Sequence, residues 1–303
     1  AGDALTEGGY NVAIGYAALT TENGHGKNIA IGYQSLRDQD AGAHAENVAI
    51  GFDSGRSMTT GVYNTIIGNR VGDALTTGSF NTAMGYNALG NEDTGGRCVA
   101  IGYNTLSSQN VDGNVYNVAV GFDAGGAVTT GIQNTILGGL AGDALTTGSD
   151  NIAIGYQALS FEDTGSKNIA IGKAALASQN YDGDAYNVAI GHSAGNQINT
   201  GTLNTLVGGL AGDALTTGAE NTALGYQAMT NANSSESRNV AIGAYALQGL
   251  DNGSTTNTYN VAVGYSAGII VSTGINNTLI GSHAGDALTT GSKNTAMGFG
   301  ALG

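Results

Sequence analysis

One pentad, Asn-x-Ala-Ile-Gly or a close variant of it, occurs 17 times in this chain of 303 residues. Glycine occupies the fifth place of every copy, and asparagine occupies the first place of all but one, where Cys98 replaces it. Copies begin at positions 11, 28, 47 and 64, and the same spacings recur from 81 and from 151 and, slightly lengthened, from 221. Four copies therefore make one repeat unit. A repeat of this period indicates a fold in which each copy adds one small element to a stack.

The pentad alternates as a β-strand does. Its second and fourth places hold Val, Ile, Thr, Leu or Met, as in Val12 and Ile14, and its third place points to the opposite face. The distance from one copy to the next, as from Asn11 to Asn28, fits one circuit of a parallel β-solenoid. A helix would lose about 1 kcal/mol at each internal glycine, and the chain has 52 glycines. The predicted fold class is therefore all-β, a parallel β-solenoid or β-roll of about 17 coils.

The repeat also predicts the domain organisation. We expect a single repeat domain over residues 1–303, made of units at 11–80, 81–150, 151–220 and 221–293. The last unit is slightly longer than the others because of small loop insertions, and half-coils at 1–10 and 294–303 flank the four units.

The first place of the pentad would form a column of asparagines about 4.8 Å apart in such a stack. Asparagine tolerates turn conformations, and stacked side-chain amides hydrogen-bond from coil to coil. We interpret the column as a structural ladder beside the core, in preference to a row of ligands for a bound polymer, and we expect Cys98 to be a buried, inert substitute. The ladder consists of Asn11, Asn28, Asn47, Asn64, Asn81, Asn117, Asn134, Asn151, Asn168, Asn187, Asn204, Asn221, Asn239, Asn260, Asn277 and Asn294.

The third place is alanine in 13 copies, as in Ala13, and a larger residue in the other four. If Val and Ile fill the interior, this column faces outward, and a strand that is apolar on both faces is usually buried on both. We therefore predict an oligomer face along the column, with a wider single-chain solenoid as the alternative. The residues assigned to this face are Ala13, Ile66, Ile136, Leu206 and Leu279.

The place after the glycine is aromatic in ten copies, beginning with Tyr16 and Tyr33. Aromatic side chains one coil apart can stack on each other, and this is the interpretation that we prefer to a sugar-binding strip. Asn69, Lys173 and two glycines interrupt the column.

Composition excludes several classes of function. The net charge of −14, with only nine Lys and Arg residues, is unsuited to nucleic acid and to anionic membranes. No run of about 18 apolar residues is present, so no membrane insertion is predicted. A single cysteine forms no internal disulfide.

No catalytic pattern recurs with the repeat. The histidines His25, His44, His192 and His283 occupy unrelated places, and no Ser-His-Asp or zinc spacing is present. We therefore predict a protein that is not an enzyme, with no catalytic, cofactor-binding or metal-binding residues. Calcium at the acidic loop 180–184 is the one alternative for a cofactor, because that loop loosely resembles a calcium loop without its closing glutamate.

The first eight places of each coil, as in Asn-Val-Ala-Ile-Gly-Tyr-Ala-Ala at 11–18, resemble the head repeats of YadA-type trimeric autotransporter adhesins. Similar repeats occur in phage tail-fibre shafts. The resemblance implies a left-handed parallel β-roll, a homotrimer and an adhesive or spacer role. This chain departs from the family in its longer coils, its four-coil superperiod and its lack of neck, coiled coil and membrane anchor.

Both ends of the chain lie in mid-coil, and the half-coils 1–10 and 294–303 would together make one coil. A head-to-tail filament with a shared coil is therefore expected, or a fragment of a longer fibre.

The leading expectation for function is a structural fibre or filament protein of the cell surface, the extracellular space or a virion. It would assemble with itself and could adhere to surface glycans. The alternative is a glycan- or receptor-binding adhesin that acts through the loop tips 40–46, 231–238 and 249–259. A distant third is an acyltransferase, because Ile14–Leu19 fits a hexapeptide pattern that such enzymes carry three times per coil and this chain carries once.

Overall fold

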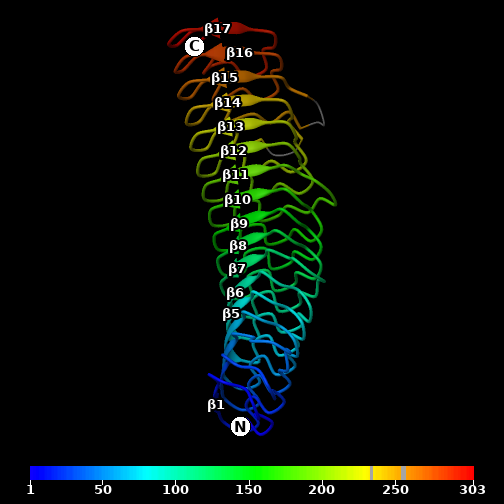
Figure 1. The fold of residues 1–303 in the computed structure, drawn as a ribbon. Coiled ribbons are helices and arrows are strands. Elements are labelled where there is room, and N and C mark those ends of the chain that lie inside the picture. Colours follow the sequence, from blue (N-terminus) through cyan, green and yellow to red (C-terminus); the bar gives the residue numbers. More distant parts are fainter. Residues whose placement is uncertain (233–234, 254–256) are drawn as a thin grey trace. The chain divides into compact units, whose positions relative to one another are not determined.

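A computed structural model describes residues 1–232, 235–253 and 257–303, and every regular element in these ranges is a strand. The chain forms two compact units, residues 1–150 and 151–303, and the division falls at the border between the second and third repeat units. In each compact unit the strands lie above one another, one strand per coil (Figure 1). The predicted parallel β-solenoid of about 17 coils is therefore confirmed. Its handedness remains a prediction.

Each strand coincides with the middle of one pentad. The first compact unit holds β1 (Val12–Ile14), β2 (Ile29–Ile31), β3 (Val48–Ile50), β4 (Thr65–Asn69), β5 (Thr82–Tyr86), β6 (Val99–Tyr103), β7 (Val118–Val120) and β8 (Thr135–Leu137). The second holds β9 (Ile152–Ile154), β10 (Ile169–Ile171), β11 (Val188–Ile190), β12 (Thr205–Val207), β13 (Thr222–Leu224), β14 (Val240–Ile242), β15 (Val261–Val263), β16 (Thr278–Ile280) and β17 (Thr295–Met297).

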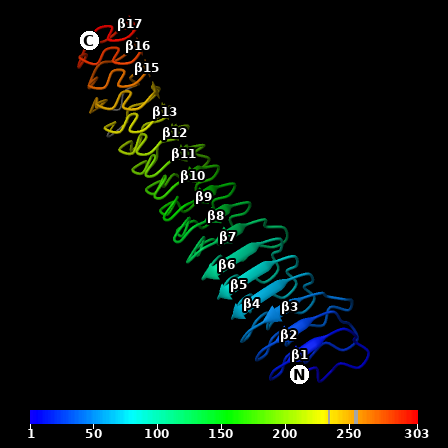
Figure 2. The ribbon, with the colours of Figure 1, turned by 90° about the vertical axis from the view of Figure 1, so that its left-hand side faces the viewer.

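Within each compact unit consecutive strands pair in parallel and in register, so that equivalent places of the pentad meet. Ala13 lies opposite Ala30 in the first unit, and Leu206 lies opposite Ala223 in the second. Figure 2 shows this side-by-side arrangement of the strands within a unit. The exact register turns each place of the repeat into a straight column of side chains.

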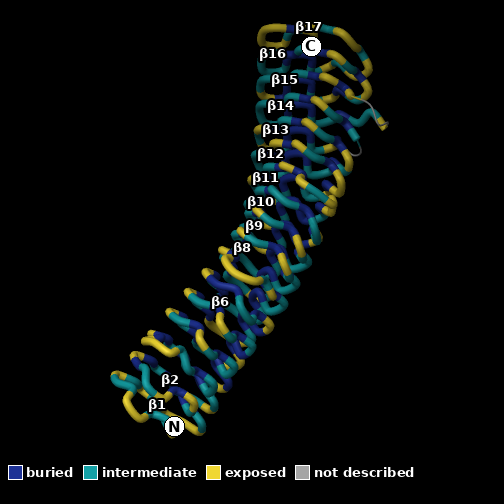
Figure 3. The backbone as a smooth tube through the Cα atoms, turned by 45° about the vertical axis from the view of Figure 1, so that its right-hand side comes forward, coloured by how far each residue is buried: buried dark blue, intermediate teal, exposed yellow. Residues whose placement is uncertain are grey.

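The third place of the pentad faces the interior, which reverses the predicted orientation of the strand. Ile66, Ile136, Leu206 and Leu279 are fully buried, and Ala13 in the first coil is half-buried. The second and fourth places are half-buried or exposed instead. Residues assigned to the oligomer face are therefore core residues, and the alternation of burial within every coil follows this pattern (Figure 3).

Two glycines in each repeat unit account for the large residue that the fourth coil carries at this buried place. In the first repeat unit Gly55 and Gly72 stand where the first two coils carry a leucine such as Leu36. A Cβ atom built on either glycine would lie 3.6 or 3.3 Å from Cδ1 of Ile66. In the fourth coil a large third-place residue such as Ile66 fills part of the space that the missing leucines leave, while the third coil keeps alanine at that place, as at Ala49.

The fifth-place glycines adopt a backbone conformation that ends the strand in most coils and lies within β4, β5 and β6. Their φ angles lie at +120° or above, as at Gly208 with φ +139°. A Cβ at Gly208 would lie 2.3 Å from the carbonyl oxygen of Gly225 in the next coil. The column therefore needs glycine both for its backbone conformation and for the close approach of stacked coils.

Candidate functional site

The asparagine ladder lies inside the solenoid. Fourteen of its members are buried, while Asn11 and Asn294 are half-buried. At Asn204 the side-chain Nδ2 donates to the carbonyl of Gly218 at 2.8 Å, and Oδ1 accepts from the backbone N–H of Asn221 at 3.0 Å. One side chain thus satisfies a carbonyl and an N–H of the following coil. A polymer bound from solvent could not reach these amides.

In the first three repeat units the side-chain amide of the ladder is least well bonded in the second coil, and this is where cysteine replaces asparagine. The loop of that coil is longer, and Nδ2 of Asn28 has no hydrogen-bond partner. The corresponding amide of Asn168 bonds only its own loop, to the carbonyl of Ser166 at 3.4 Å. At Cys98 the backbone N–H still donates to Oδ1 of Asn81 at 3.0 Å, and Sγ accepts from the side-chain amide of Gln109 at 3.3 Å.

Cys98 is predicted to be unreactive in the folded protein. Its side chain is 1% exposed, and burial raises the pKa of the thiol to about 11, so almost none of it is thiolate at pH 8. Incubation with 5,5′-dithiobis(2-nitrobenzoate) at pH 8 should release less than about a tenth of one equivalent of chromophore in native buffer and one equivalent in guanidinium. Rapid stoichiometric release from the native protein would contradict the prediction.

The outward face of the strands forms an uncharged surface in each compact unit, made of aliphatic side chains and, at seven second places, of threonines such as Thr65 and Thr205. No second or fourth place of any pentad is charged, although the chain carries nine Lys and Arg and 23 Asp and Glu residues. In the second compact unit Ile190 is 36% exposed and Leu224 is 46% exposed. We call this surface, made of the second and fourth places of the pentads, the strand face.

Two exposed columns border the strand face. On one side the aromatic residues after the glycines stack, with ring centroids 5.0–5.2 Å apart for Tyr33–Phe52 and Tyr86–Tyr103. On the other side lies the residue that precedes each asparagine, which has a positive φ in every coil. This second column holds ion pairs such as Lys27–Glu46 at 3.0 Å and Arg238–Glu220 at 3.1 Å. The surface thus combines uncharged strands with stacked aromatic rings and with ion pairs at its border, and aromatic residues are enriched in protein interfaces.

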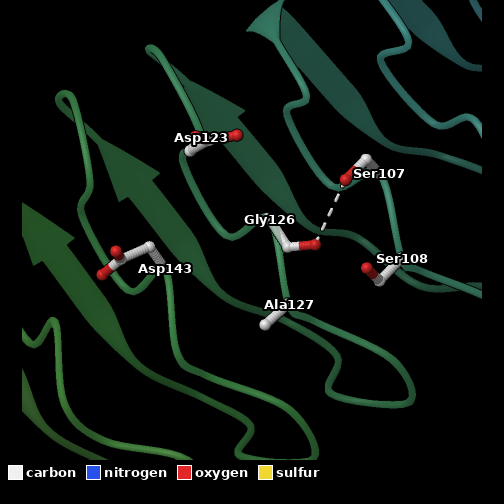
Figure 4. Close-up of a pocket in the computed structure, with 6 residues that line it drawn as sticks. All are labelled: Ser107, Ser108, Asp123, Gly126, Ala127 and Asp143. Carbon is white, nitrogen blue, oxygen red and sulfur yellow. Dashed lines mark hydrogen bonds between the residues drawn. The ribbon is translucent and has the colours of Figure 1, made fainter.

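A pocket of about 300 Å³ opens in the first compact unit on the side of the turns (Figure 4). Ser107, Ser108, Asp123 and Asp143 line it together with two small residues, and the Ser107 hydroxyl donates to the carbonyl of Gly126 at 3.3 Å. Burial raises the pKa of the Asp143 carboxyl, and the charge of Asp123 raises it further. The lining holds no histidine, lysine or arginine. The serine hydroxyls of this pocket therefore have no basic side chain of the lining beside them.

A second pocket of about 420 Å³ in the same unit contains two arginines. Arg56 pairs with Asp53 at 3.3 Å, and Arg70 pairs with Asp73 at 3.4 Å. Asn87 and other polar residues complete the lining. These groups can donate and accept hydrogen bonds, as a sugar requires.

The acids of the loop 180–184 do not converge on one point. Asp182 accepts from the hydroxyl of Thr164 at 2.7 Å, and Asp184 pairs with Nζ of Lys167 at 2.5 Å. Calcium at this loop stays a prediction. Of the loop tips, residues 233–234 and 254–256 lie outside the described residues.

The histidines have separate surroundings. His283 lies between Tyr265 and Phe299, with ring centroids 5.5 and 5.9 Å away. His25 instead lies in the turn of the first coil, 3.6 Å from Glu22.

No protein-family model matches the sequence, and no curated protein matches it. Among the residues that the structure describes, no helix has the length and apolarity needed to cross a bilayer.

Proposed function

We propose that this chain is a structural shaft protein, a non-enzymatic solenoid that associates with further copies of itself through the strand face. A repetitive β-solenoid suits a structural repeat protein in general. The observation that supports self-association is the uncharged strand face, since exposed apolar patches beyond a few hundred Å² mark interaction surfaces.

The strand face and its two bordering columns together have the size of a stable interface. Eight strands about 4.8 Å apart give a length of about 40 Å in the first compact unit, and an extended segment that includes the bordering columns gives a width of about 20 Å. The resulting area of roughly 800 Å² matches what each partner of a standard interface buries. The second compact unit repeats the same surface, with nine strands.

The occupant that we assign to this face is a second and third copy of the chain. The face is uncharged and repeated at every coil, so a copy of the same period would match it along its length. A homotrimer is the form that the resemblance to adhesin heads and tail-fibre shafts implies. An extracellular, cell-surface or virion location belongs to the same proposal.

Analytical ultracentrifugation of the full chain tests the proposal. Wild-type protein should sediment as a trimer, and the double variant I190K/L224K should sediment as a monomer or show at least tenfold weaker association. The variant should keep the circular dichroism of the wild type, because both side chains lie outside the core.

F161K is the matched control, because Phe161 is 66% exposed but lies in a loop away from the strand face. It should leave the mass unchanged. A monomeric wild-type chain at 100 µM would overturn the proposal.

A glycan-binding role is the second candidate, and the Arg56–Arg70 pocket favours it. The pocket is polar, and the stacked ring of Tyr86 belongs to the coil that also contributes Asn87. Sugars bind where hydrogen-bonding groups adjoin an aromatic face. Glycan-array binding that R70A abolishes while the oligomeric mass stays constant would support it, and no binding above background would exclude it.

A further inference from the structure

A buried glutamate recurs in the first coil of the first three repeat units. Glu22, Glu92 and Glu162 occupy equivalent places of the repeat and are each 0% exposed. In each case one carboxylate oxygen accepts the N–H three residues later, from His25 at 3.0 Å, Gly95 at 2.7 Å and Gly165 at 2.7 Å. The shared role is to close this turn.

The second carboxylate oxygen distinguishes the first repeat unit. Oε2 of Glu92 accepts from the side-chain amide of Gln109 at 2.8 Å, and Oε2 of Glu162 accepts from the backbone N–H of Tyr181 at 3.3 Å. Oε2 of Glu22 is buried and has no hydrogen-bond partner. The counterpart of Gln109 is Gln39, and it donates to the carbonyl of Thr59 at 3.0 Å instead.

Two substitutions accompany the unpartnered oxygen. His25 replaces the glycine found at 95 and 165, and Asp40 replaces the asparagine found at 110 and 180. Ligand atoms of Glu22, His25 and Asp40 all lie within 4.8 Å of one another. Nδ1 of His25 is 3.6 Å from Oε1 of Glu22 and makes no hydrogen bond. The first repeat unit thus places three possible metal ligands together, whereas each of the next two repeat units has only the glutamate at these places.

We infer that Glu22, His25 and Asp40 form a binding site for one divalent transition-metal ion, for which zinc is the best fit. Zinc takes imidazole and carboxylate ligands at about 2.0–2.2 Å, which places neighbouring ligands of a tetrahedron about 3.4 Å apart. The 3.6 Å separation of His25 and Glu22 is close to that value. A water molecule would complete the four-coordinate shell. Calcium fits poorly because it requires six to eight oxygen ligands.

The surroundings are consistent with a cation at this point. Burial raises the pKa of the Glu22 carboxyl, and the negative charge of Asp40 raises it as well. His25 and Asp40 are half-buried and leave a route to solvent. A bound ion would join the turn of the first coil to that of the second, because Asp40 belongs to the second coil.

The test uses the full chain and zinc chloride as the probe. Isothermal titration calorimetry in buffer free of phosphate and chelator should give one zinc ion per chain. The double variant H25G/D40N, which restores the residues of the next two repeat units, should bind zinc at least tenfold more weakly. Cobalt(II) should show visible absorption of tetrahedral intensity with the wild type and lose it with the variant.

Two controls keep the result interpretable. H283Q removes another histidine that contacts a carboxylate, Asp286 at 3.2 Å, and should leave the affinity unchanged. H25G/D40N should retain the circular dichroism of the wild type, because the equivalent coils of the next two repeat units carry glycine and asparagine at these places. Equal zinc affinity in wild type and H25G/D40N, or no binding by the wild type at 100 µM zinc, would overturn the inference. The oligomeric mass is measured separately, so failure here leaves the shaft proposal standing.

Discussion

Substitution of Gly208 by alanine should destabilise the coils around it by more than about 4 kcal/mol. Its φ of +139° is a region that L-residues rarely adopt, which alone costs about 1–3 kcal/mol. The added Cβ would also lie 2.3 Å from the carbonyl oxygen of Gly225, so the stacked coils must separate. Separation breaks the bond from the Gly225 N–H to the Val207 carbonyl, which is 2.8 Å long. Hydrogen–deuterium exchange should therefore show lost protection over 204–226.

Gly209 provides the matched control one residue away. A Cβ there would meet only the ring of Tyr226, at 3.5 Å, which is an ordinary contact. The G209A variant should keep its exchange protection and lose less than about 0.5 kcal/mol. Equal protection in G208A and G209A would show that the bend tolerates a side chain, contrary to the prediction.

Substitution of Asn204 by alanine should cost roughly 2–6 kcal/mol, because it leaves two buried groups of the next coil without a partner at about 1–3 kcal/mol each. These are the carbonyl of Gly218, at 2.8 Å from Nδ2, and the N–H of Asn221, at 3.0 Å from Oδ1. Aspartate would retain the acceptor and lose the donor, and it would bury a charge. The chemical denaturation midpoint of N204A measures the effect.

Asn180 is a suitable comparison because it is an asparagine of the same compact unit that lies exposed in a loop. N180A should unfold within about 0.5 kcal/mol of the wild type. If N204A were as stable as N180A, the hydrogen bonds of the ladder would add nothing to the free energy of unfolding, which would contradict the prediction.

The stacking of the coils was predictable because it depends on period alone. Once equivalent residues meet in register, the glycine at 208 and the asparagine at 204 must each lie beside their own kind. A column of identical residues then indicates that every coil needs the same backbone conformation or the same hydrogen bonds at that place. Both columns have the structural roles that their chemistry suggests.

The direction in which the strand faces could not be deduced from its alternation. Both faces are apolar, with Val12 and Ile14 on one and Ala13 on the other, so the larger side chains were assigned to the core. The true signal was the co-occurrence of Ile66 with Gly55, which helps to supply the space that Ile66 fills. Recognising it requires knowing that Leu36 and Gly55 occupy the same position of the coil, both at positive φ.

The candidate metal site was missed because its residues are sparse in the sequence. Glu22 stands in a polar turn, where acids are normally solvated, and His25 has no counterpart in the next two repeat units. A usable signal existed in the regular spacing of Glu22, Glu92 and Glu162, since identical acids at one place of a solenoid share one environment. Asp40 lies near Glu22 only because the two positions are about one coil apart along the chain.

The parallel register has a mechanical consequence. Hydrogen bonds between successive coils point along the stacking direction, so a pull in that direction loads them one coil after another. A single coil adds about 5 Å to the stack, but once detached it extends to about 60 Å. Under tension each compact unit would lengthen roughly tenfold in small equal steps, and every step would dissipate work. Such a solenoid would behave as an extensible tether that absorbs work under load where a stiff rod would fracture.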